Sequence, residues 1–116
     1  MRARYMTMTV NHMEESVAFY RDIMGFSVDS TYEVGPDASI TLLQAGDAVI
    51  ELIENKAFPT GLYSIGIDVD CLDETLAHLQ ENGVCVIMQP VPTQVGRMAF
   101  VQDPDGVRLA LIEHKK

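Results

Sequence analysis

The chain has 116 residues, of which 47% are apolar, and its formal net charge is −9. This length suits one compact domain, and this apolar content is typical of folded chains and not of disordered ones. No apolar run approaches the roughly 18 residues of a membrane-spanning helix, and the acidic balance argues against nucleic acid, which needs a basic surface. The short alternating N-terminus is unlike a signal peptide, so we expect a cytoplasmic protein with no membrane or nucleic-acid partner.

The first half of the chain predicts one strand, one helix and three more strands. Residues 3–10, ARYMTMTV, alternate in polarity as a half-buried strand does. Apolar residues at 13, 17, 20 and 24 then form one stripe of an amphipathic helix. Three strand-like runs follow, with turn signals at 35–37 and 45–47 between them: FSVDSTYEV at 26–34, SITLLQA at 39–45 and AVIELIE at 48–54.

The second half predicts the same order of elements. LYSIGIDV at 62–69 reads as a strand, and apolar residues at 72, 76 and 79 make a second helical stripe. The turn DPDG at 103–106 has Pro at its second position and Gly at its fourth. The three strand-like runs after the helix are VCVIMQPV at 84–91, RMAFVQ at 97–102 and VRLALIE at 107–113.

The two halves are also similar in sequence. VNHMEESVAFY at 10–20 aligns with VDCLDETLAHL at 69–79, an offset of 59 residues. We therefore predict a single α+β domain of two βαβββ modules, at 1–58 and 59–116. A sheet of this size with one helix buries little on its own, so the modules are expected to form a curled mixed sheet, a cup with the helices outside.

Both helices carry similar end signals. Side-chain acceptors at Asn11 and Asp70, each followed three residues later by an acid, predict N-terminal caps. Gly25 and Gly83 are expected to end the two helices, because glycine readily adopts the left-handed conformation found there.

These features together resemble the vicinal oxygen chelate superfamily, which includes glyoxalase I, bleomycin resistance proteins and extradiol dioxygenases. The resemblance lies in the paired modules, the opening YMTMTVNHMEESVAFYRDIMGF at 5–26, AVIEL at 48–52 and the ending FVQDPDGVRLALIE at 100–113. It covers almost the whole chain. It implies a small molecule held in the cup and a homodimeric assembly.

The resemblance also implies four positions where metal-dependent members place their ligands. Here these positions hold Tyr5, Glu51, Ser64 and Ala110, and the 59-residue offset relates 5 to 64 and 51 to 110. Only Glu51 is a competent ligand for a divalent metal. Glu113 cannot replace Ala110, since an odd number of steps along a strand reverses the face. We therefore expect no metal cofactor.

The alternation of side chains along each strand predicts which residues line the cup. The lining mixes apolar walls with a few polar groups, as small-molecule pockets do. The predicted ligand-binding residues are Tyr5, Thr7, Val49, Glu51, Ser64, Met88, Met98, Phe100, Arg108, Ala110 and Ile112.

Glu51 is the best candidate for a functional side chain, and the sequence leaves its role open. It is predicted to pair with Arg108, to anchor a cationic or hydrogen-bonding ligand, or to act as a general base with a raised pKa. The corresponding functions are a metal-free binding protein, a metal-free enzyme that uses Glu51 as base, and a metal-dependent lyase or isomerase of the glyoxalase type.

Overall fold

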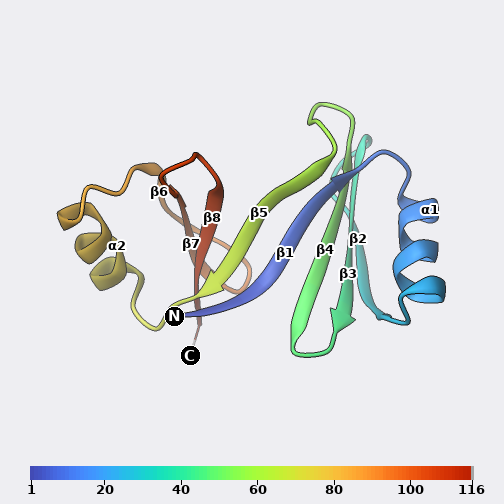
Figure 1. Ribbon diagram of the computed structural model, residues 1–116, viewed down its shortest axis with the longest axis horizontal. Coiled ribbons are helices and arrows are strands. Elements are labelled where there is room, and N and C mark those ends of the chain that lie inside the picture. Colours follow the sequence, from blue (N-terminus) through green and yellow to red (C-terminus); the bar gives the residue numbers. More distant parts are fainter. Residues whose placement is uncertain (116) are drawn as a thin grey trace. The chain divides into compact units, whose positions relative to one another are not determined.

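The computed structural model describes residues 1–115, which form two compact units. The first unit is Tyr5–Tyr63. The second unit consists of residues 64–115 together with Met1–Arg4. Each unit contains one helical segment and the predicted succession of strands (Figure 1). No helix in the described residues is long and apolar enough to cross a membrane.

The first unit has a mixed sheet in the order β2-β3-β4-β1. Strand β1 runs parallel to β4, whereas β2 and β3, and β3 and β4, are antiparallel. Its elements are β1 (Arg2–Val10), which belongs to this unit from Tyr5 onward, α1 (Met13–Ala18), the π-helical turn η1 (Phe19–Ile23), β2 (Ser27–Glu33), β3 (Ala38–Ala45) and β4 (Ala48–Asn55).

The second unit repeats this plan in the order β5-β8-β7-β6, with β5 parallel to β8. The predicted succession of strands and helices is confirmed in both halves, although β6 begins at Val86 and not at Val84. The elements are β5 (Gly61–Asp68), α2 (Leu72–Glu81), β6 (Val86–Pro92), β7 (Gly96–Gln102) and β8 (Arg108–His114).

The helix of each unit packs on one face of the sheet and buries the main apolar cluster there. In Figure 1, α1 lies beside β3 and β4. The cluster of the first unit is Leu43, Ile50 and Leu52, with Met13, Val17 and Tyr20 from the helical segment packed against it. The cluster of the second unit is Val69, Leu72, Leu76, Ala99, Val101 and Leu111.

The first helix differs from the predicted continuous stripe at its C-terminal end. The N–H of Met24 donates to the carbonyl of Phe19, five residues earlier, at 3.1 Å. Such a wider turn changes the direction of the side chains that follow it. Met24, predicted to face the core, is consequently 51% exposed, whereas Tyr20 stays in the core and stacks on Phe26. Gly25 ends the segment with a φ of 82°, as expected.

The predicted caps at Asn11 and Asp70 are wrong. The N-cap residues are His12 and Cys71, and neither side chain caps its helix. A carboxylate from the last strand of each unit takes that role. The N–H of Met13 donates to Glu54 Oε1 at 2.7 Å, and the N–H of Leu72 donates to Glu113 Oε2, also at 2.7 Å.

These two contacts obey the sequence repeat, because residues 13 and 72, like residues 54 and 113, are 59 positions apart. The parallel pairing of β1 with β4 brings Glu54 beside Val10, just before the helix begins. A strand residue is already ordered by its ladder, so less conformational entropy is lost when it caps the helix. The negative charge also suits the positive end of the helix dipole.

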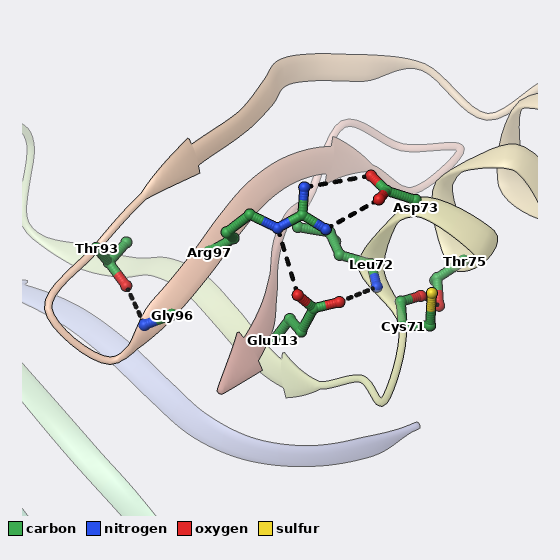
Figure 2. A network of polar contacts seen from close by, with 8 residues as sticks. All are labelled: Cys71, Leu72, Asp73, Thr75, Thr93, Gly96, Arg97 and Glu113. Atoms are coloured by element: carbon green, nitrogen blue, oxygen red, sulfur yellow. Dashed lines mark hydrogen bonds and ion pairs between the residues drawn. The ribbon is translucent and has the colours of Figure 1, made fainter. Parts of the chain in front are cut away.

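In the second unit an arginine joins the cap (Figure 2). Arg97 Nε donates to Glu113 Oε1 at 3.3 Å, while its two terminal nitrogens donate to the carboxylate of Asp73 at 3.3 and 3.1 Å. The Leu72 N–H and, after it, Arg97 lower the pKa of Glu113. The hydrogen bonds with Asp73 and then Glu113 raise the pKa of Arg97.

Gly96 lies where β7 begins, against the strand that carries Glu113. Its N–H donates to Thr93 Oγ1 at 3.1 Å (Figure 2). Its carbonyl accepts the Thr93 N–H at 2.8 Å. A Cβ on this residue would lie 1.9 Å from the carbonyl oxygen of Glu113. Only glycine fits this approach of two backbones.

The charge of Glu113 is predicted to make stability depend on pH. Folding lowers the pKa of Glu113 from its ordinary value of 4.5, so its contribution is complete above that pH and is lost as the pH falls through the lowered pKa. Glu113→Gln should lower the Tm at pH 7 by roughly 3–6 °C, and the deficit should shrink between pH 5 and pH 3. Thermal unfolding followed by circular dichroism across this range measures both effects.

The control is Glu81→Gln, at the exposed last position of α2. This variant loses the same charge and should follow the wild-type Tm at every pH. A Glu113→Gln deficit that stays constant down to pH 3 would contradict a role for the carboxylate charge.

Gly96→Ala is predicted to destabilise the fold by roughly 2–4 kcal/mol, because the new methyl group must displace backbone. The matched control is Gly106→Ala, whose φ is 90° and whose added Cβ would meet nothing within 4 Å. That variant should lose only about 1–2 kcal/mol, the usual strain of the left-handed conformation. Urea denaturation measures both losses, and equal losses would refute the predicted clash.

Candidate ligand-binding site

The candidate site in the first unit lies on the sheet face opposite α1. Strand pairing sets Tyr5 beside Val49 and Thr7 beside Glu51. Partners in a ladder project from the same face. Four of the predicted ligand-binding residues therefore share this face.

The same face also carries residues that the sequence did not single out. Leu42 of β3 pairs with Glu51, and Ser30 of β2 pairs with Leu42, so that one row crosses all four strands. Period-two alternation along β3 could have identified Leu42. Ser30 was harder to find, because a bulge between Val28 and Ser30 shifts the register of β2.

Thr7 holds the carboxylate of Glu51 in place. The Thr7 hydroxyl donates to Glu51 Oε1 at 2.7 Å, and Thr7 itself is buried. This hydrogen bond involves one carboxylate oxygen, Oε1. The arrangement gives an oriented, half-buried carboxylate, a group that can accept a hydrogen bond from a ligand or take up a proton.

The second unit has an equivalent face opposite α2. Phe100 pairs with Ala110, Met98 with Ile112, and Met88 with Phe100. Arg108 and Ser64 fall on this face by the same alternation. Ser64 and Ala110 are buried. The predicted residues of the second half thus lie on one sheet face, with Met88, Met98 and Phe100 in the expected orientation.

The two units differ at one rung of their parallel ladders. In the first unit this rung pairs Thr7 with Glu51, and in the second unit it pairs Gly66 with Ala110. The 59-residue offset relates the two rungs. The polar side chains of this rung in the first unit therefore have no counterpart in the second unit.

The side chains at the four implied positions do not fit the divalent metal that metal-dependent members of the family bind. Of the four implied positions, Ala110 has no donor atom, and the neutral hydroxyls of Tyr5 and Ser64 are poor ligands. Glu113 faces α2, where it binds the Leu72 N–H and Arg97. Within residues 1–115, no group of three or more His, Cys, Asp and Glu side chains could hold a metal ion.

Known proteins are similar to this chain in sequence or in fold. Lactoylglutathione lyase of Salmonella typhimurium is 30% identical over 128 aligned residues, which cover 99% of this chain and 94% of the lyase. A solved structure of a hypothetical protein from Bacillus halodurans superimposes on 99% of the chain, and on 95% of its own, with a TM-score of 0.86 at 23% identity. Methylmalonyl-CoA epimerase from Mycobacterium tuberculosis superimposes on 99% of the chain, and on 89% of its own, with a TM-score of 0.82 at 18% identity.

These structural matches confirm the predicted fold class. Residues 2–111 also match the family model described as the glyoxalase/bleomycin resistance protein/dioxygenase superfamily. This match agrees with the family expected from the sequence motifs. The chain therefore belongs to the glyoxalase/bleomycin resistance protein/dioxygenase superfamily.

Proposed function

We propose that this protein binds a small organic molecule without a metal, and that Glu51 anchors the ligand. The observation that supports this most directly is the Thr7–Glu51 hydrogen bond of 2.7 Å, which fixes the orientation of the carboxylate. A metal site of the family type would need donors at Tyr5, Ser64 and Ala110 that these side chains do not supply.

The face around Glu51 favours a ligand with a cationic or hydrogen-bonding group and an apolar body. Val49 and Leu42 flank the carboxylate in the first unit. Met88, Met98 and Phe100 are proposed as ligand contacts on the corresponding face of the second unit, because thioethers and aromatic rings adapt to flat or irregular ligands. Arg108 and Ile112 complete the proposed set of contacts on that face of the second unit.

An enzyme is the alternative function, and the similarity to lactoylglutathione lyases over nearly the whole chain favours it. A lyase or isomerase of this type would need a divalent metal. A metal-free enzyme would instead use Glu51 as a general base, with Thr7 fixing the orientation of its carboxylate.

The binding proposal predicts thermal stabilisation that survives EDTA. A panel of planar aromatic compounds with cationic groups should include members that raise the Tm, and a ligand at 100 times its Kd adds about 2.7 kcal/mol. For such a compound Glu51→Gln should weaken binding at least tenfold, because it removes the charge from the hydrogen bond. Thr7→Val should weaken binding about threefold by releasing the carboxylate.

Glu81→Gln is the control of equal charge and should leave the shift unchanged. A panel without any shift, or a shift that disappears with EDTA, would contradict metal-free binding. A stoichiometric divalent metal in protein purified without chelator would favour the lyase. A Glu51→Gln variant that binds normally but loses turnover would favour the metal-free enzyme.

We also propose a homodimer, which the family resemblance suggests. The apolar side chains of Val28, Tyr32 and Val34, in and after the edge strand β2, are 41–51% exposed and would be available to a partner. Light scattering should give twice the chain mass of 12.9 kDa. A single monomeric species at micromolar concentration would refute the dimer.

A further inference from the structure

The side chains around the start of the helix differ between the two units, because the second unit has an arginine there and the first unit does not. In the second unit the guanidinium of Arg97 lies between Asp73 in α2 and Glu113 in β8 (Figure 2). Arg97 reaches both carboxylates because it pairs with Glu113 in the β7–β8 ladder.

The first unit has both carboxylates but no arginine. Glu14 is the second residue of α1, as Asp73 is of α2, and Glu54 corresponds to Glu113. The ladder partner of Glu54 is Ser39. A short hydroxymethyl group therefore stands where the second unit has the long side chain of Arg97.

The hydrogen bonds of Glu54 match this difference. One oxygen, Oε1, accepts the Met13 N–H, while Oε2 makes no hydrogen bond to another described residue. In the second unit both oxygens of Glu113 are used, one by the Leu72 N–H and the other by Arg97 Nε. The unused oxygen of Glu54 thus corresponds to the one that receives a guanidinium in the repeat.

A cavity of about 570 Å³ lies at this place in the first unit. Its volume is in the range of small-molecule pockets. Glu33 of β2 is the ladder partner of Ser39 on the side away from Glu54, and it adds a further carboxylate to the cavity. The lining contains one basic side chain and four acidic ones: His12, Met13, Glu14, Glu15, Thr31, Glu33, Ser39 and Glu54.

We propose that this cavity binds a guanidinium group, carried by a small guanidino compound or by an arginine side chain of a peptide. The planar guanidinium presents several N–H donors that match two carboxylates, as Arg97 does with Asp73 and Glu113. The site is separate from that of Glu51, since Glu54 lies three residues further along β4 and faces α1. It therefore does not depend on the proposed ligand of Glu51.

The binding test is an amide NMR titration of the full-length protein at constant ionic strength. The probes are guanidinium chloride at low millimolar concentration, L-arginine amide, L-lysine amide and a capped Gly-Arg-Gly tripeptide. The amides of Met13, Glu14 and Ser39 should shift with the three guanidinium probes, with a Kd on the order of 1 mM for guanidinium itself. Lysine amide should bind at least threefold more weakly than arginine amide, because it lacks the planar donor fork.

Three variants test the location. Ser39→Arg copies the second unit, and it should abolish the shifts and raise the Tm. Glu14→Gln should weaken binding about threefold to tenfold by removing one carboxylate. Glu74→Gln in α2 removes the same charge far along the chain and should bind as the wild type does.

The outcomes decide two questions, whether the guanidinium site exists and whether its ligand is a peptide or a small guanidino compound. Tighter binding of the capped tripeptide than of arginine amide supports a peptide partner, and the reverse order supports a small guanidino compound. Equal shifts with lysine amide, or shifts that persist in both Ser39→Arg and Glu14→Gln, would overturn the proposal. If Ser39→Arg does not fold, a comparison of guanidinium binding by Glu14→Gln and by Glu74→Gln still tests the location of the site.

Discussion

The contact between a strand carboxylate and the first N–H of a helix is the constraint on which each unit depends. Glu54 and Glu113 make it, each from the end of the last strand of its unit. In each unit the contact joins two residues that are 41 positions apart in the sequence. It also satisfies an amide that no neighbouring side chain caps. The end of the sheet and the start of the helix are thereby held in one geometry.

This contact also determines what the opposite face can offer. Because side chains alternate along a strand, a residue three positions before the capping carboxylate must project away from the helix. Glu51 and Ala110 occupy that position in the two units. The cap and the candidate ligand-binding face are therefore two consequences of one strand register. A slip by one residue would lose both the cap and the orientation of Glu51.

Local patterns in the sequence predicted the strands and the repeat, but they could not predict contacts between segments that are far apart in the chain. Alternation alone placed Glu113 on the face opposite Ala110, as its contacts with Leu72 and Arg97 confirm. The caps were missed because Asn11 and Asp70 carry a strong local signal, whereas the true acceptors come from the last strand of each unit. The bulge in β2 and the π-helical turn at Phe19 each insert a residue, and no period in the sequence marks such an insertion. The bond from Thr7 to Glu51 required knowledge of which strands pair.

The two units share a backbone plan yet distribute their polar groups unequally. On the face away from the helix, the rung of Thr7 and Glu51 corresponds to one of Gly66 and Ala110. On the helix side, Ser39 corresponds to Arg97, and the guanidinium uses the second oxygen of Glu113. In both places the first unit carries a carboxylate, and the second unit lacks the carboxylate or binds it to Arg97. An internal partner stabilises the fold but occupies the oxygen that a ligand would need. The capping carboxylate that the fold requires is thus present in both units, whereas the residues around it differ.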